Sequence, residues 1–179
     1  MKPRLTPVSE LSLHAEQQAI LDKIAASRAG NLNGPFHAWI RNPEFADLAQ
    51  ALGKYCRYDS HLSLRQSELL IVVTAAFWNS QAEWAIHAPI AESAGVCPRA
   101  IEKIRTGITP NFRQDDERLL HIVAKTLLEQ KLLPDDLYAE ALAYFGEAHM
   151  VDIVGIIGYY SMVALTLNAF DIRVTPALA

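Results

Sequence analysis

The chain has 179 residues, 51% of them apolar and 20% charged, which suits a single domain with a hydrophobic core and excludes the disordered and low-complexity classes. Sixteen Lys and Arg against twenty Asp and Glu give a net charge of -4, whereas a protein that binds nucleic-acid phosphates is normally basic. The chain has only two cysteines, Cys56 and Cys97, which excludes a disulfide scaffold and a four-cysteine metal site. The two do not form a CxxC pair.

Helical patterns follow one another along the chain, and no strand-type alternation is sustained anywhere. Eight or so helices predict one domain over residues 1–179 with an orthogonal or bundle-like all-α fold. In the first half we expect a helix at 12–28, a loop or short helix within 31–42, and helices at 43–55, 63–78, 80–94 and 98–107. In the second half we expect helices at 115–130, 134–145 and 147–168, followed by a tail at 170–179.

Several of these helices have recognisable first turns. Asn42-Pro43-Glu44 supplies an N-cap, a proline at the first helical position and an acid near the helix dipole. Ser63 with Gln66, and Ser80 with Glu83, have the spacing of capping boxes. Both pairs therefore predict the start of a helix.

The longest apolar stretch, 153–167, is about 15 residues and is short for a membrane span, which favours a buried core helix or an interface between subunits. No apolar segment follows the basic residues at the N-terminus, so we expect no targeting segment. The sequence predicts a cytoplasmic protein that binds neither membrane nor nucleic acid and forms a homo-oligomer.

Three polar residues share one face of the predicted helix at 80–94. Ser80, Glu83 and His87 stand at positions i, i+3 and i+7, and Glu68 can join them if its helix packs antiparallel to theirs. A Glu–His–Glu group of this kind is suited to general acid–base chemistry on a small anionic molecule. At the third position of the helix, Glu83 is expected to be kept ionised by the helix dipole.

Structural roles explain the same residues without any chemistry. Ser80 and Glu83 can serve only to start the helix, His87 can be a hydrogen-bonded core histidine, and Glu68 can simply face the dipole of its own helix. Tyr159 can offer a hydroxyl to a pocket or pack as an ordinary aromatic residue. The remaining histidines lack the spacing of a metal site, and no nucleotide-binding or serine-hydrolase motif is present, so we expect neither metal nor cofactor.

The segment from Asn42-Pro43-Glu44 through 62–68 to the block Glu83-Trp84-Ala85-Ile86-His87 resembles the carboxymuconolactone decarboxylase family, which includes alkyl hydroperoxidase D. The resemblance covers about residues 30–170, which it implies are the core of the domain. It implies an all-α fold of packed helical hairpins of the alkyl hydroperoxidase D type, assembled as trimers or hexamers, with a dimer as a further possibility. In the hydroperoxidase branch a glutamate is followed by CxxC and a histidine, and these positions hold Glu68, Ser80, Glu83 and His87 here. Both thiols are therefore replaced.

The resemblance also implies a chemistry. The decarboxylase branch is thought to use acid–base residues without a cofactor, which here gives His87 as proton donor and Glu68 and Glu83 as the groups that tune it. A cation such as Arg57 would hold a substrate carboxylate. Ser80, Trp84 and Tyr159 complete the predicted substrate-binding set.

Three functions follow from these observations. The first is a carboxy-lyase or related proton-transfer enzyme acting on a small carboxylated or lactone substrate, as in the catabolism of aromatic compounds. The second is a peroxiredoxin-like activity, which would require Cys56 or Cys97 to reach the site, because Ser80 and Glu83 supply no thiolate. The third is an oligomeric protein that binds a small acid without turning it over.

Overall fold

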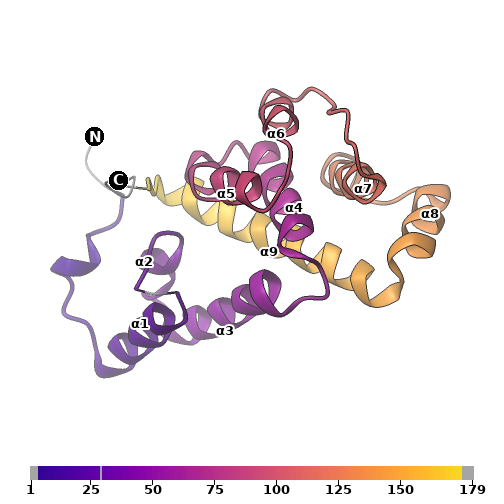
Figure 1. The fold of residues 1–179 in the computed structure, drawn as a ribbon. Helices are drawn as coiled ribbons and strands as arrows, with labels where there is room; N and C mark the ends of the chain where they lie inside the picture. The colour runs from indigo at the N-terminus through magenta and orange to yellow at the C-terminus, as the bar shows by residue number, and fades with distance from the viewer. Residues whose placement is uncertain (1–3, 29, 175–179) are drawn as a thin grey trace.

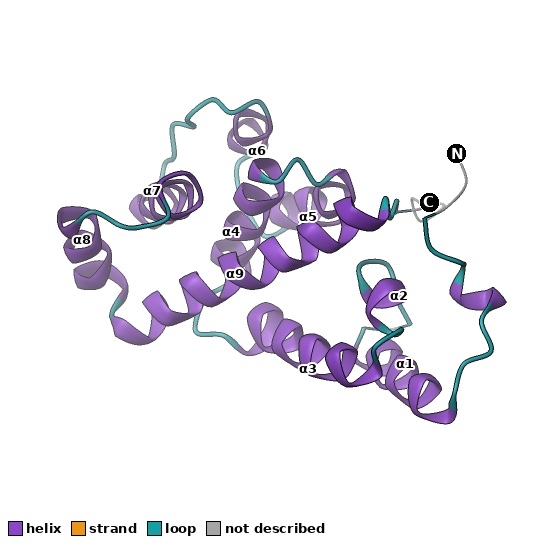
Figure 2. Cartoon of the chain, turned by 180° about the vertical axis from the view of Figure 1, so that it is seen from behind, coloured by secondary structure: helices purple, strands orange, loops and turns teal. Residues whose placement is uncertain are grey.

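The computed structural model describes residues 4–28 and 30–174, and within them all regular structure is helical (Figures 1 and 2). In these two described ranges, nine α-helices are joined by loops, with single turns of other helix types at Val8–Glu10 (η1) and Tyr55–Asp59 (η2). The α-helices are α1 (Ala15–Ser27), α2 (Phe36–Trp39), α3 (Pro43–Lys54), α4 (Leu64–Phe77), α5 (Gln81–Ser93), α6 (Pro98–Arg105), α7 (Asp115–Gln130), α8 (Asp135–Phe145) and α9 (Glu147–Phe170). The predicted all-α class is confirmed.

The centre of the fold is α4, which packs against α5, α7 and α9. Its residues 69–72 have no exposed surface, so this helix is apolar on every side and is covered on every side. A short connection turns the chain back from α4 into α5, and the two helices form a close antiparallel hairpin. That hairpin brings the first turn of α4 beside the second and third turns of α5.

The first three helices form a group that lies on the opposite side of α9 from α4 to α7 (Figures 1 and 2). Trp39 of α2 joins this group to α9: its indole nitrogen donates a 3.1 Å hydrogen bond to Thr166 Oγ1, and its ring contacts Tyr159 edge-on. The helix α9 therefore lies between the two parts of the molecule and contributes side chains to both.

Two of the predicted helix starts form as expected. Asn42 accepts a hydrogen bond from the backbone of Phe45, with Pro43 at the first helical position. Ser63 and Gln66 make a complete capping box. The prediction for Ser80 was wrong in one respect: it is the N-cap residue of α5, but its side chain makes no capping hydrogen bond.

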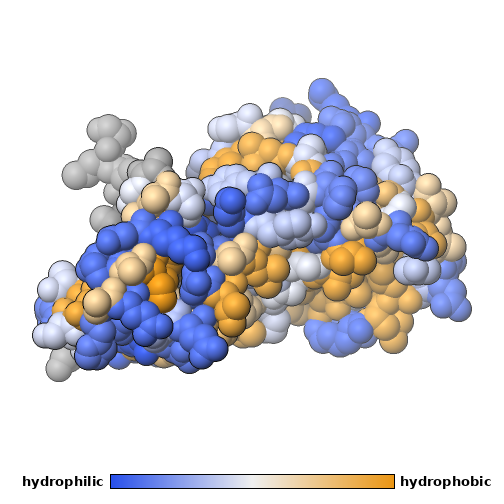
Figure 3. Space-filling view, turned by 90° about the horizontal axis from the view of Figure 1, so that it is seen from below, coloured by the Kyte–Doolittle hydropathy of each residue, from blue (hydrophilic) through white to orange (hydrophobic). Residues whose placement is uncertain are grey.

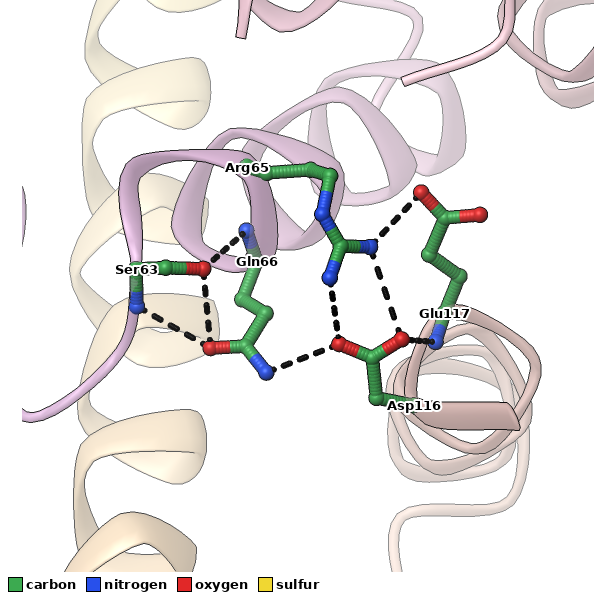
Figure 4. A network of polar contacts seen from close by, with 5 residues as sticks. All are labelled: Ser63, Arg65, Gln66, Asp116 and Glu117. Carbon is green, nitrogen blue, oxygen red and sulfur yellow. Dashed lines mark hydrogen bonds and ion pairs between the residues drawn. The ribbon is translucent and has the colours of Figure 1, made fainter. Parts of the chain in front are cut away.

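Polar contacts fix the start of α4 against the start of α7 (Figure 4). Arg65 reaches Asp116 Oδ2 at 2.7 Å and Glu117 Oε1 at 2.8 Å, and Gln66 donates to Asp116 as well. Burial raises the pKa of Asp116. The hydrogen bonds from Arg65 and Gln66 and the positive charge of Arg65 lower it by more, so the pKa lies below its usual value. The carboxylate is therefore held ionised against its guanidinium partner.

The long helix α9 is apolar around its whole circumference although only part of it is covered. Among the described residues it is the one helix long and apolar enough to cross a membrane, but 56% of its apolar window is buried, as in a core helix. The uncovered face carries apolar or small residues at helical spacing, which are Val151, Val154, Gly155, Gly158 and Leu165.

Hydrophobic residues also reach the surface on the face of the molecule seen in Figure 3. On α3 the exposed apolar residues are Phe45, Leu48 and Leu52, of which Leu48 is 68% exposed. After α9 the chain runs without regular structure to residue 174, and the rest of the predicted tail lies outside the described residues.

Candidate functional site

The hairpin of α4 and α5 places His87 between two carboxylates. Glu68, from α4, has its Oε2 2.8 Å from His87 Nδ1, and Glu83, one turn before His87 on α5, has its Oε2 3.5 Å from Nε2. The three residues that the spacing and the antiparallel packing were expected to bring together do meet in the structure.

This group is almost completely removed from solvent. Glu68, Glu83 and His87 are 0%, 2% and 3% exposed. Five buried side-chain nitrogen or oxygen atoms lack a hydrogen-bond partner within the described part of the chain, and four of them belong to the region of this group, namely Arg57 Nε, Glu68 Oε1, Ser80 Oγ and Glu83 Oε2. Because an unpaired buried polar atom is costly, such a concentration is typical of a site built for a ligand or a reaction.

Burial raises the pKa of Glu83, and the nearby charge of Glu68 adds to that effect. The charges of His87 and Arg57 act in the opposite direction and do not cancel it. The helix dipole alone would lower the pKa of Glu83, whereas at a side chain 2% exposed the loss of hydration gives the net shift the opposite direction. Glu83 can hold a proton at a higher pH than an exposed glutamate does.

A cavity of about 760 Å³ opens next to Glu83 and His87. It lies between α5, the first part of the chain and α9, and its volume suits a small organic molecule. Arg57, Tyr159 and Tyr160 line it together with the two acid–base residues. The apolar part of the wall is formed by Phe36, Ala85, Ile86, Ile90, Val163 and Val174.

Glu68 does not line this cavity, because it lies behind His87 with no exposed surface. Its contacts are His87 Nδ1 on one oxygen and Arg57 Nε, 3.9 Å away, on the other. Arg57 lies on the π-helical turn η2 that follows α3. Glu68 therefore orients two residues that face the cavity, and its own position is that of a positioning residue.

Two tyrosines of α9 stand beside the acid–base group. The ring of Tyr160 meets the ring of His87 edge-on with 5.2 Å between centroids, and Tyr159 meets Tyr160 in the same way. Burial raises the pKa of both phenols, so both remain neutral hydroxyls. The Tyr159 hydroxyl lies so close to Gly53 that a Cβ there would be 2.1 Å from it, which makes the glycine a steric requirement for this arrangement.

Two of the predicted substrate-binding residues are placed elsewhere. Trp84 lines a different depression, shared with Pro98 and Ile101, because it is one residue after Glu83 and so points about 100° around the helix from it. Ser80 is 1% exposed and is absent from the cavity wall. Neither position allows contact with a molecule in the cavity.

The cysteines lie outside the cavity wall. Cys56 is buried, and burial with the nearby charge of Asp152 raises its pKa to about 11, so at neutral pH it is almost entirely a thiol. Cys97 is exposed at the start of α6. In the described residues, no three His, Cys, Asp or Glu side chains are grouped to hold a metal ion.

Two further cations of the cavity wall were not predicted from the sequence. Arg28, at the end of α1, and Lys54, at the end of α3, both line the cavity, as do Asn31 and Asn33 of the loop before α2. A basic residue in the last turn of a helix is common, so nothing in the pattern distinguished these residues. Their role depends on how α1 and α3 pack, which is a long-range property.

Residues 43–112 match the model of the carboxymuconolactone decarboxylase family. A search of curated protein sequences gives no significant match. Among solved structures, the chain resembles an uncharacterized peroxidase-related protein from Silicibacter sp. TM1040, with a TM-score of 0.79 and 15% identity over 97% of this chain and 92% of that one.

Two further solved structures share the fold. A protein of unknown function from Agrobacterium tumefaciens, described as a candidate antioxidant defence protein AhpD, has a TM-score of 0.70 and 16% identity over 80% of this chain and 99% of its own. The debrominase Bmp8, as a cysteine-to-alanine variant in complex with 2,3,4-tribromopyrrole, has a TM-score of 0.76 and 16% identity over 98% and 94% of the two chains. At these identities the likeness concerns the fold.

Proposed function

We propose that this chain, whose residues 43–112 match the model of the carboxymuconolactone decarboxylase family, is a cofactor-free acid–base enzyme that decarboxylates, or moves a proton within, a small carboxylated or lactone substrate. The observation that carries this proposal is the chain of contacts Glu68–His87–Glu83, whose last two members line a cavity of about 760 Å³. That geometry is what proton transfer to a bound molecule requires.

The contacts assign a role to each group. Glu68 accepts a hydrogen bond from the N–H at His87 Nδ1. The other ring nitrogen, Nε2, then faces Glu83 and the cavity. One proton shared between Glu83 and Nε2 is then available to the substrate. The raised pKa of Glu83 helps to retain that proton at neutral pH.

A decarboxylation at this site proceeds in two parts. The carbon–carbon bond to the carboxylate breaks, carbon dioxide leaves, and the electron pair remains on the substrate as an enolate. The proton held by His87 and Glu83 is then transferred to the carbanionic carbon. Arg57, whose Nε has no hydrogen-bond partner among the described residues, can stabilise the negative charge of the enolate or of a carboxylate.

The test is a substrate screen in which carbon dioxide release and peroxide consumption are recorded together. The panel contains lactone carboxylates and 3-oxo acids, and each active compound is retested with His87→Gln. Carbon dioxide release that is lost in His87→Gln supports the proposal. Turnover at the wild-type rate in that variant contradicts it.

The same screen distinguishes the two other functions. Peroxide consumption that disappears in the double variant Cys56→Ser, Cys97→Ser would establish thiol chemistry, which the raised pKa of Cys56 and the position of both cysteines disfavour. Saturable binding of a small acid with no turnover of any compound would establish a binding protein. The debrominase likeness adds no substrate to the panel, because it concerns the fold alone.

We also propose that the working unit is a homo-oligomer joined through the uncovered stripe of α9. Val151 is 71% and Val154 51% exposed, and the neighbouring Gly155 and Gly158 have open space where a Cβ would stand, so a second helix can approach closely. Light scattering after size exclusion is expected to give more than one subunit, and Val154→Glu is expected to lower that number. A monomeric wild-type protein contradicts this assembly.

A further inference from the structure

Arg28 is a half-buried cation on the cavity wall whose charge has no partner. It ends α1, and its guanidinium lies 4.6 Å from the centroid of the Phe36 ring and donates a 2.7 Å hydrogen bond to Ser27 Oγ. No carboxylate of the described residues comes within ion-pair distance of it. In the described part of the chain, the hydrogen bond of its guanidinium therefore goes to a neutral hydroxyl.

The partial burial of the positive charge of Arg28 is energetically unfavourable. Burial lowers the pKa of Arg28, and the positive charge of Arg57 lowers it further. The phenols of Tyr159 and Tyr58 act in the opposite direction without balancing the effect. The guanidinium groups of Arg28 and Arg57 repel each other across the cavity. An anion that binds between or beside them reduces this repulsion.

The other cations of the cavity wall have a carboxylate within ion-pair distance. Lys54 is 3.6 Å from Asp59, and Arg57 Nε is 3.9 Å from Glu68. Among the described residues Arg28 has no such carboxylate, and its one hydrogen bond to a side chain uses one nitrogen of a guanidinium that carries five N–H donors. A planar carboxylate matches the free edge of such a group.

The remainder of the cavity wall indicates what the carboxylate is attached to. Ile86, Ile90 and Val163 present apolar surface, and Tyr159 presents a neutral ring. An apolar body of the size of one aromatic ring can pack there while its carboxylate reaches the guanidinium. A strongly hydrated inorganic anion gains nothing from this part of the wall.

We propose that Arg28 is the residue that anchors a carboxylate of the substrate, and that the substrate class is a small organic acid with an apolar, ring-sized body. This rests on the proposed function for the identity of the reaction, but the anchor is a binding property that exists without turnover. The acid–base pair His87–Glu83 and the anchor Arg28 then hold two different parts of one molecule.

Ligand-observed NMR titrations with acetate, benzoate, benzamide and inorganic phosphate test the anchor. Benzoate is expected to bind more tightly than acetate, phosphate and the neutral benzamide. Arg28→Gln is expected to weaken benzoate roughly tenfold or more, as loss of a charge-assisted bidentate contact does, and to leave benzamide unchanged. Arg28→Lys, which keeps the charge and loses the planar fork, should fall between the two.

Arg99→Gln, an exposed arginine of α6 outside the cavity, is the matched control and should bind benzoate as the wild type does. Wild-type affinity for benzoate in Arg28→Gln overturns the proposal, as does equal affinity of the wild type for benzoate and benzamide or no saturable binding of either. His87→Gln separates the two proposals. If it retains benzoate binding while no compound is turned over by the wild type, the anchor holds and the enzymatic function fails.

Discussion

His87 Nδ1 lies 2.8 Å from Glu68 Oε2, and neither side chain is more than 3% exposed. An imidazole held in this way has a fixed ring orientation, and its other nitrogen is directed at Glu83. The contact joins two helices that are adjacent in sequence, so it forms whenever the α4–α5 hairpin forms. The orientation of the acid–base group is therefore a property of this hairpin.

Removing the charge of Glu68 is expected to lower turnover without weakening substrate binding. Glu68→Gln keeps the size of the side chain but no longer stabilises a positively charged His87, so kcat should fall at least about 10²-fold while KM stays close to the wild-type value. Steady-state kinetics on a substrate found by the screen measure this. Glu68→Asp, which restores a carboxylate, should recover part of kcat. A variant with an increased KM and unchanged kcat would show that Glu68 contacts the substrate instead.

The raised pKa of Glu83 predicts how stability depends on pH. Between its unfolded value near 4.5 and its higher folded value, the native state binds more protons than the unfolded state, so the free energy of unfolding falls as pH rises through this window. Glu83→Gln removes that slope and should gain stability relative to the wild type as pH increases. Urea unfolding from about pH 4 to about pH 8 measures it. Glu92→Gln, an exposed control on the same helix, should show no such trend, and the same flat result for Glu83→Gln would refute the raised pKa.

Gly53→Ala is expected to disturb the cavity through Tyr159. The new Cβ would stand 2.1 Å from the tyrosine hydroxyl, so the ring must move, at a cost of about 1–3 kcal/mol in stability. Gly155→Ala is the contrasting change in a helix, because a Cβ there meets nothing within 4 Å in its own subunit and raises helix propensity by up to about 1 kcal/mol, and light scattering shows separately whether it changes the proposed oligomer. Thermal unfolding of both variants, and benzoate titration of the first, give the comparison. Equal stabilities of the two variants would show that the Tyr159 ring can move at no cost and would contradict this prediction.

Arg65→Met should destabilise the fold by about 1–3 kcal/mol, since it leaves the carboxylates of Asp116 and Glu117 without their guanidinium. Arg118→Met breaks an exposed ion pair with Glu140 and should change stability much less, because solvent screens an exposed pair. Urea unfolding of the two variants at neutral pH compares a partly buried pair with an exposed one. A loss no larger in Arg65→Met than in Arg118→Met would contradict the bracing role of Arg65.

The helices and the acid–base group were predictable because the information is local. Asn42-Pro43 and the Ser63–Gln66 box fix helix starts within one turn, and the spacing of Glu83 and His87 places them on one face. What failed depends on burial and packing. Ser80 has the spacing of a cap but makes no capping bond, and Glu83 is near a helix start but is too buried for the dipole to decide its pKa.

The substrate side of the cavity was not predictable for the same reason. Arg28 precedes Glu83 by more than fifty residues, and only the packing of α1 and α3 beside α9 brings it to the wall. Trp84 was assigned to the site as part of the block Glu83-Trp84-Ala85-Ile86-His87, whereas one step along a helix turns a side chain away from its neighbour. Adjacency in sequence is a poor guide to which side chains line a cavity.

The segment that matches the family model, 43–112, contains Glu68, Glu83 and His87, while Arg28 and the tyrosines of α9 lie outside it. The proposed acid–base residues and much of the cavity wall around them are thus encoded in separate stretches of the chain. Substitutions at Arg28, Asn31 or Asn33 would change the cavity wall without replacing Glu68, Glu83 or His87. The architecture is in this sense modular, and selectivity can diverge without any change in the reacting groups.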